Sequence, residues 1–243
     1  MLANPGRHHT GNRYADHRPY QLVIFNALFG NLVMAKHRSS RRWLAEHHQD
    51  PYVKQAREAG YRSRAVYKLL EINERDRLLR PGMTVIDLGA APGGWSQVAV
   101  KYAGKTGRVI AVDILPMEPV AGVDFIQGDF REQIVLDRIL TMLAGRQVDL
   151  VISDMAPNIT GMRAVDQPGS MYLVELAADL SCQVLRKGGG MLLKAFQGTG
   201  FQEMVRDLHH GYERVVIRKP AASRARSRET YIVAQNFQCA GVD

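Results

Sequence analysis

A glycine-rich turn follows a short apolar run near the middle of the chain. Residues 84–88 read TVIDL, and residues 89–94 read GAAPGG. A dinucleotide site would instead show G-x-G-x-x-G, whose backbone and following helix N-terminus hold a pyrophosphate. A sulfonium carries a positive charge and no phosphate, and a carboxylate such as Asp87 suits that charge. The turn therefore favours an S-adenosylmethionine pocket over a dinucleotide pocket.

Acidic residues recur near the ends of four successive apolar runs, beginning with Asp87. In open α/β sheets, ligands bind beyond the carboxyl ends of the strands. Asp113 follows the glycine turn by about 20 residues, where a carboxylate accepts hydrogen bonds from ribose hydroxyls. Asp129, in the sequence QGDF, is expected to meet an adenine edge, and Asp154 ends the fourth run. Any one of them alone could be a helix cap or a turn residue, but four in succession indicate a pocket.

The residues around Asp154 restrict which kind of atom could accept a methyl group. Residues 154–158 read DMAPN, without the Pro-Pro-aromatic sequence that is typical of methylation at a base amino group. Methylation at carbon 5 of a pyrimidine needs a cysteine nucleophile near the donor. Cys182 falls within a predicted helix and Cys239 lies in the C-terminal tail. An oxygen acceptor remains, and a hydroxyl group needs a base and precise placement.

Lys194 is the first candidate for that base, because it interrupts the apolar run MLLKAF at residues 191–196. A lysine at the end of a core strand costs several kcal/mol unless it is paired or neutral. Burial and a neighbouring cation both favour the neutral form of a lysine, which can accept a proton. The alternative is a strand-end lysine whose ammonium reaches solvent.

Lys68 and Glu229 are weaker candidates when they are read alone. With Ser63 as the N-cap of a helix, Arg64, Lys68 and Arg75 would share one face. Such a face is ordinarily solvated, and Glu229, at the start of the last predicted strand, would ordinarily be a surface residue.

Basic residues concentrate between residues 214 and 228, which hold six of them and no acid. A basic loop at a sheet edge suits phosphate contacts, which give affinity without sequence preference. Arg41 and Arg42, beside Trp43, extend this character, and the formal net charge of the chain is +8. A polyanionic partner fits this balance.

Alternating apolar and helical patterns predict the elements that position these residues. Such alternation predicts one doubly wound sheet that is mostly parallel, with helices on both faces. The last two strands have no obvious helix between them, so one of them should be antiparallel. The expected strands are Thr84–Leu88, Arg108–Val112, Val123–Gln127, Asp149–Ser153, Met191–Ala195, Arg214–Arg218 and Thr230–Ala234. The expected helices lie near Trp95–Tyr102, Arg131–Leu143, Ser170–Leu185 and Phe201–Leu208.

The chain has 243 residues, of which 46% are apolar, enough for one sizeable α/β domain. We expect residues 1–38 to be a poorly ordered extension, and residues 39–243 to form a single domain that begins with a basic helical segment, 39–80. Two cysteines without a CxxC pair fit a reducing, cytoplasmic setting. The apolar segment Leu22–Ala35 is too short to span a membrane, which takes about 20 residues. Adjacent histidine pairs point to different helix faces, so no metal site is expected.

Several long motifs together resemble the FtsJ-type heat-shock RNA 2′-O-methyltransferases, and in particular the bacterial enzymes that act on large-subunit ribosomal RNA. The similarity runs from about Arg41 to Gln235 and rests on SRAVYKL, MTVIDLGAAPGGWSQ, DILPM, GVDFIQGDF, SDMAPN, MYLVELA, KAFQG and RKPAASRARSRETYIVA. The residues before about Met34 depart from the usual bacterial form.

The resemblance implies a Rossmann-like, seven-stranded methyltransferase fold, S-adenosylmethionine as methyl donor, and roles for particular residues. A K-D-K-E catalytic tetrad would consist of Lys68, Asp154, Lys194 and Glu229. The donor site would be lined by Gly93, Trp95, Asp113, Asp129 and Asp154. RNA contacts are expected from Arg62, Arg64, Arg224, Arg226 and Arg228.

The resemblance also implies a substrate: a uridine in the A loop of 23S ribosomal RNA, methylated on the assembled large subunit. A monomer is expected, because nothing in the sequence indicates a dedicated dimer face. Transfer RNA, an mRNA cap or another RNA is the alternative substrate for a 2′-O-methyltransferase. A silent ribosome-assembly factor that keeps the fold without turnover is an alternative outside the enzyme class. A nicotinamide-dependent oxidoreductase is disfavoured, because the glycine turn lacks the dinucleotide spacing.

Overall fold

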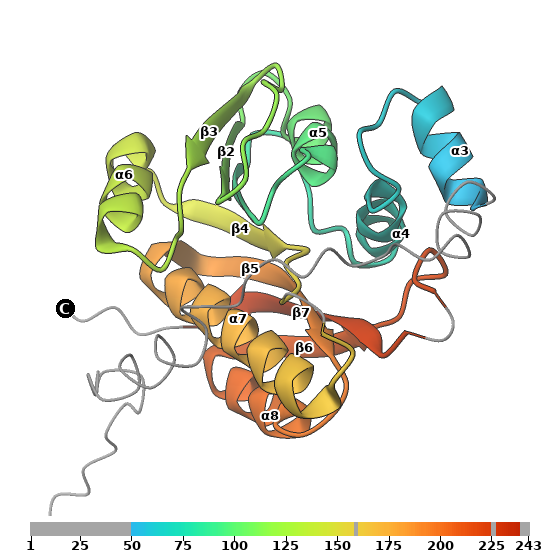
Figure 1. Ribbon diagram of the computed structural model, residues 1–243. Helices are drawn as coiled ribbons and strands as arrows, with labels where there is room; N and C mark the ends of the chain where they lie inside the picture. Colours follow the sequence, from blue (N-terminus) through green and yellow to red (C-terminus); the bar gives the residue numbers. More distant parts are fainter. Residues whose placement is uncertain (1–49, 158–159, 225–226, 239–243) are drawn as a thin grey trace, which may run out of the picture. The chain divides into compact units, whose positions relative to one another are not determined.

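The computed structural model describes residues 50–157, 160–224 and 227–238 (Figure 1). The expected N-terminal extension (1–38), the first part of the basic segment (39–49) and Arg226 lie outside these ranges, so the expectations about them stay predictions.

Seven strands form one sheet in the order β3-β2-β1-β4-β5-β7-β6. The first five strands in this order are parallel, and β7 is antiparallel to both β5 and β6. This arrangement confirms the mostly parallel seven-stranded sheet and the antiparallel strand near the C-terminus. The strands are β1 (Thr84–Leu88), β2 (Arg108–Asp113), β3 (Val123–Gln127), β4 (Val148–Ser153), β5 (Leu185–Phe196), β6 (Tyr212–Arg218) and β7 (Glu229–Phe237).

Helices cover both faces of this sheet, as its two apolar clusters show (Figure 1). One cluster joins the sheet to α6, α7 and α8, and the other joins it to α4 and α5. Every residue of β1 is buried, as expected for a central parallel strand that is covered on both faces. The helices are α3 (Pro51–Glu58), α4 (Val66–Asp76), α5 (Gly94–Ala103), α6 (Gln133–Leu143), α7 (Arg163–Val184) and α8 (Phe201–Gly211).

The strand register brings the expected chemical residues to one edge of the sheet. Ser153 at the end of β4 pairs with Leu193 of β5, so Asp154 and Lys194 follow side by side. In the antiparallel pair, Lys194 of β5 is opposite Tyr231 of β7. The ends of β4 and β5 and the start of β7 therefore meet at one place.

Some elements differ from the sequence-based expectation in their bounds. Helix α7 begins at Arg163 and contains Pro168, where a helix boundary would be expected. The proline lies within the first two turns of the helix, so only one backbone hydrogen bond near the helix start is lost. Strand β5 begins at Leu185 and runs through three glycines that resemble a loop in the sequence. A Cβ on Gly190 would lie 2.8 Å from the backbone oxygen of Ala234, so the close strand pairing itself requires glycine there.

Candidate active site

Two lysines and two acids meet where β4, β5, β7 and α4 come together. The Asp154 Oδ1 atom lies 3.2 Å from Lys194 Nζ and 4.0 Å from Lys68 Nζ. Lys68 Nζ lies 2.8 Å from Glu229 Oε1, and Lys194 also donates to the backbone carbonyl of Asp154. The Lys194 side chain is only 9% exposed and that of Lys68 is 12% exposed. The structure thus brings together all four residues of the expected tetrad and excludes a solvated face for Lys68.

Glu229 is held in its charged form by its neighbours. Burial alone would raise the pKa of Glu229, but the Lys68 ammonium and a hydrogen bond from Ser223 outweigh that cost. The Ser223 hydroxyl donates to Glu229 Oε1 at 2.7 Å. The pKa of Glu229 therefore lies below its usual value, and the carboxylate remains a counterion for Lys68 at neutral pH.

Tyr231 belongs to the same cluster, although the sequence interpretation missed it. Its hydroxyl donates to Asp154 Oδ1 at 2.6 Å, and its buried ring lies 5.8 Å from that of Trp95. Burial, together with the charges of Asp154 and Glu229, raises the pKa of Tyr231 well above the usual value, so the phenol stays a donor. A signal was available in the sequence: residues two apart on a strand share a face, and Tyr231 follows Glu229 by two.

A cavity of about 290 Å³ opens over this cluster. Lys68, Lys194 and Glu229 line it, with Phe196 and Arg224 in the wall. A reacting hydroxyl placed in this cavity would meet both lysines, while the phenylalanine ring and the guanidinium suit the base and phosphate of a nucleotide.

The glycine turn is built for close approach by a ligand. Gly89 and Gly93 have φ values of 71° and 103°, a region that strongly favours glycine. The Asp113 carboxylate fixes the turn, accepting from the Ala91 N–H at 2.8 Å and from the Leu115 N–H at 2.8 Å. Each carboxylate oxygen can accept a further hydrogen bond, as ribose hydroxyls would require.

Ile114 and Leu115, directly after Asp113, are 65% and 58% exposed. Apolar side chains open to solvent beside a carboxylate fit the adenine and ribose of S-adenosylmethionine, and the sequence interpretation did not single them out. The residues present therefore suit this donor.

Trp95 and Asp129 make contacts within the protein itself. Trp95 is buried, and its indole N–H donates to the Ala65 carbonyl at 2.8 Å, which ties α5 to the start of α4. Asp129 accepts from Arg131, whose hydrogen bonds and charge lower the pKa of Asp129 against the opposing effect of burial. Contacts from either residue to the donor stay predictions.

Asp87 is the fourth of the five residues of β1, one residue from the glycine turn, as the sequence predicts. It is buried, and the Ser96 hydroxyl donates to its Oδ2 at 2.6 Å. Burial raises the pKa of Asp87 to about 7, opposed by the Ser96 hydrogen bond and reinforced by the charges of Asp154 and Asp113. A contact between Asp87 and the donor stays a prediction.

The arginines expected to contact RNA fall into two groups. Arg62 donates to the carbonyl oxygens of Pro92, Glu118 and Pro119, and Arg64 pairs with Asp50, so both brace loops. Arg64 also lies before α4, not on the helix as expected, because the helix begins at Val66. Arg228 is exposed and Arg224 lines the cavity. RNA contact by any of them stays a prediction.

Within the described ranges, no group of three or more histidine, cysteine or acidic side chains is arranged to hold a metal ion. None of the helices in those ranges is both long enough and apolar enough to cross a membrane.

The seven-stranded sheet, the glycine turn and the acid-lined strand ends define the class of Rossmann-like S-adenosylmethionine-dependent methyltransferases. Sequence comparison identifies the family within this class: the FtsJ-like methyltransferase family matches residues 61–237. The chain belongs to this family.

Relatives agree with this assignment over most of the chain. A protein of Marinobacter nauticus, named ribosomal RNA large subunit methyltransferase E, is 60% identical over 207 residues, which cover 85% of this chain and 100% of the relative. A protein of Stutzerimonas stutzeri with the same name is 58% identical over 84% of this chain and 100% of the relative. A crystal structure of a protein assigned as a ribosomal RNA methyltransferase from Plasmodium falciparum has a TM-score of 0.66 and 28% identity, and covers 73% of this chain and 98% of that one.

Proposed function

We propose that this protein transfers a methyl group from S-adenosylmethionine to the ribose 2′-hydroxyl of a uridine in the A loop of 23S ribosomal RNA. The observation that carries the reaction is the cluster of Lys194, Asp154, Lys68 and Glu229 beneath an open cavity. The names of the relatives, which match over their whole lengths at about 60% identity, support the large-subunit substrate.

The cluster supplies what an oxygen acceptor requires. When bound, S-adenosylmethionine supplies a methyl group on a sulfonium, which is released as a neutral thioether when the oxygen–carbon bond forms. Lys194, which lines the cavity, acts in its neutral amine form: its Nζ takes the proton of the 2′-hydroxyl and becomes an ammonium, and Asp154, 3.2 Å away, stabilises the charge so formed. The proton leaves the oxygen as the new bond forms, so the ether product is neutral.

The other members of the cluster hold Lys194 in place. Asp154 accepts from Tyr231 and faces both lysines, so its position is fixed from three sides. Glu229 draws Lys68 to itself at 2.8 Å, compared with the 4.0 Å that separates Lys68 from Asp154. Lys68 is then mainly the partner of Glu229, which leaves Asp154 chiefly to Lys194.

A monomer suffices for this reaction, since every member of the cluster comes from one chain. The assembled large subunit in the cytoplasm is the proposed substrate. Of the five arginines expected to contact RNA, Arg224 and Arg228 are the described ones best placed for phosphate contacts near the cluster, because one lines the cavity and the other is exposed.

The test is methyl transfer from labelled S-adenosylmethionine to large ribosomal subunits from a strain that lacks its own enzyme. Free 23S RNA and transfer RNA are tested in parallel. Nuclease digestion should recover the label as a 2′-O-methyluridine from the A loop. Label on transfer RNA alone would refute the proposed substrate, and label on a base would refute the proposed chemistry. Donor binding without transfer to any RNA would favour a silent assembly factor.

A further inference from the structure

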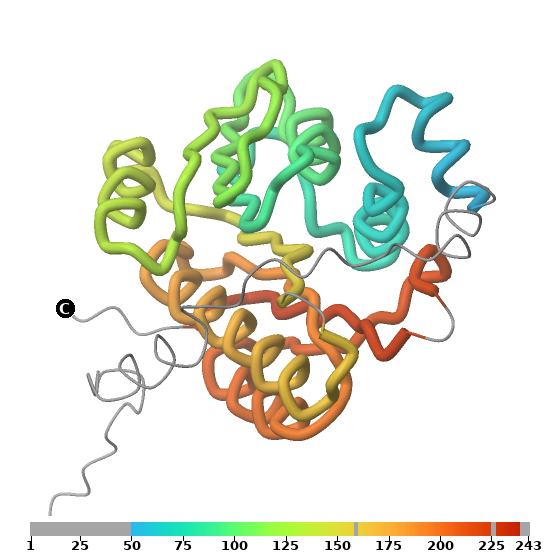
Figure 2. The backbone as a smooth tube through the Cα atoms, viewed as in Figure 1, coloured from blue at the N-terminus to red at the C-terminus, as the bar shows by residue number. Residues whose placement is uncertain are grey.

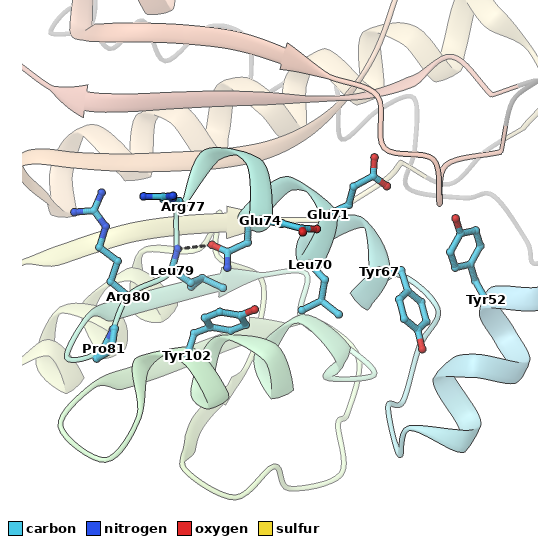
Figure 3. Close-up of a pocket in the computed structure, with 11 residues that line it drawn as sticks. Tyr52, Tyr67, Leu70, Glu71, Glu74, Arg77, Leu79, Arg80, Pro81 and Tyr102 are labelled. Carbon is cyan, nitrogen blue, oxygen red and sulfur yellow. Dashed lines mark hydrogen bonds between the residues drawn. The ribbon is translucent and has the colours of Figure 1, made fainter.

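A groove of about 790 Å³ lies along α4 and shares no lining residue with the cavity over the lysine–carboxylate cluster; Figure 3 shows the side chains that line it. Its lining comes from α3, α4, the segment that follows α4, and α5. Tyr67, Leu70 and Glu74, spaced three to four residues apart, present one face of α4 to it. The side chain of Lys68, the next residue after Tyr67, contacts Glu229 in the cluster. The same helix therefore borders both the groove and the lysine–carboxylate cluster.

Three tyrosines line the groove. Tyr52 from α3 and Tyr67 from α4 pack on each other, with ring centroids 5.4 Å apart, and Arg64 lies over the Tyr52 ring. Tyr102 from α5 is 37% exposed, and an exposed aromatic ring is a surface on which proteins stack unpaired bases of single-stranded RNA.

Two arginines supply the complementary charge. Arg77 and Arg80 both line the groove and are exposed. The Leu79 N–H donates to Asn73 Oδ1 at 2.7 Å, drawn as the dashed line in Figure 3, and fixes the segment that carries Arg80. These guanidinium groups can contact phosphate without reading sequence.

The backbone at Arg77 allows its side chain to be removed without new strain. Arg77 is the C-cap of α4 with φ 51°, a conformation in which helices usually place glycine. Ala144 ends α6 in the same conformation, with φ 49°, and provides a matched control.

The acids of the groove do not exclude an RNA ligand. Both carboxylate oxygens of Glu71 accept from the Ala221 N–H, at 2.8 and 3.0 Å, and so bind the basic loop to α4. Figure 2 shows this loop approaching α4 from far along the chain. Glu74 is exposed, and a carboxylate accepts hydrogen bonds from the amino groups of bases.

We propose that this groove binds an unpaired nucleotide of the RNA substrate, with its base against Tyr102 and its phosphate on Arg77 and Arg80. The inference rests on the proposed function and adds a second contact for the same RNA. Lys68 and Arg77 are separated by roughly 13 Å along the helix, at about 1.5 Å per residue. The bound nucleotide therefore lies a few positions away from the methylated one.

The test measures binding of a short fluorescent single-stranded RNA to the full chain by anisotropy. Arg77→Gly removes the guanidinium where glycine suits the backbone, so its Tm should not fall. Its dissociation constant should rise, and the slope of log Kd against log salt should become shallower by about one. Tyr102→Ala should raise Kd about 5-fold or more, whereas Tyr102→Phe should retain the affinity.

Matched controls separate the groove from general effects. Ala144→Gly relieves another left-handed C-cap, φ 49° at the end of α6, and Arg146→Ala removes an arginine from the turn that follows. Neither should change RNA affinity. If Arg77→Gly and Tyr102→Ala bind RNA as the wild type does, the proposal is overturned. If these two variants keep the wild-type affinity for RNA but have a raised KM for assembled subunits, the proposal is also overturned, and the groove contacts a ribosomal protein instead. Methylation of subunits by the wild type, measured alongside, tests the proposed function separately.

Discussion

At the scale of single residues, the site depends on how charge is shared among buried groups. Asp154 meets the Nζ atoms of two lysines and a phenol, while Glu229 meets one lysine Nζ and a hydroxyl. Two acids thus face two lysines in a region where an unpaired charge would be costly, so the charge that Lys194 gains with the proton has a counterion in place. Each member of the cluster is accordingly expected to have a distinct effect when it is changed.

Glu229→Gln should slow methyl transfer by about 10-fold, less than the 10²- to 10⁴-fold typical of a group that moves a proton. The amide can still accept from Ser223 but no longer neutralises Lys68, which is then free to draw Asp154 away from Lys194. Single-turnover kinetics on large subunits would measure the effect. A loss as large as that of Lys194→Ala would contradict a supporting role.

Asp87→Asn should change how stability depends on pH. The folded-state pKa of Asp87, about 7, lies above its ordinary value of 3.8. The stability that the protonated carboxyl contributes is therefore fully present below pH 3.8 and is lost as pH rises through 7. Between pH 4 and pH 8, the free energy of unfolding of the variant should therefore rise relative to that of the wild type, by up to about 4 kcal/mol. Urea unfolding at several pH values measures this difference. A difference that stays constant with pH would show that the carboxyl is ionised throughout.

At the scale of elements, a buried ion pair fastens α4 to the edge of the sheet. Asp76, at the end of α4, is fully buried and accepts from Arg214 at 2.8 Å and Arg218 at 2.7 Å, both on β6. Because α4 carries Lys68, this attachment fixes the helix that supplies one of the two lysines of the cluster and the partner of Glu229.

Asp76→Asn should lower the free energy of unfolding by about 3 kcal/mol, since it leaves two arginines without their counterion. Burial alone would raise the pKa of Asp76, but the hydrogen bonds and charges of Arg218 and Arg214 lower it below the usual value. The stabilisation is therefore present above the ordinary pKa and is lost as pH falls through the folded-state pKa. Denaturant unfolding at neutral and acidic pH should show a smaller variant effect in acid. Asp124→Asn, in the exposed pair with Arg108, is the control, with less than about 1 kcal/mol expected.

Local pattern was sufficient to predict most strands and the glycine turn, because apolar runs and turns are encoded by neighbouring residues. It was insufficient for α7 and β5, where Pro168 and three glycines resemble breaks but are accommodated by tertiary packing. The pairing of Lys68 with Glu229 depends on where α4 meets β7, which spacing does not specify; only the resemblance implied it. Tyr231 was missed because its hydroxyl matters only once β5 and β7 are paired in register.

At the scale of the whole molecule, one face of α4 borders the reaction site and another borders the tyrosine-lined groove. The donor turn lies at the ends of neighbouring parallel strands, beside the cluster that would receive the acceptor hydroxyl. In the proposed function, the glycine turn holds the donor and the cavity over the cluster holds the reacting ribose, and the groove is the further surface proposed for RNA. Lys194 is the residue proposed to take the acceptor's proton, and the reaction depends on it most directly.

The most direct measurement is single-turnover transfer of labelled methyl to large subunits by the wild type, Lys194→Ala and Lys194→Arg, with donor affinity measured by calorimetry. Both variants should bind S-adenosylmethionine as the wild type does and lose transfer by about 10² to 10⁴-fold, because neither alanine nor a guanidinium can accept the proton. Transfer by Lys194→Arg at the wild-type rate would contradict the account.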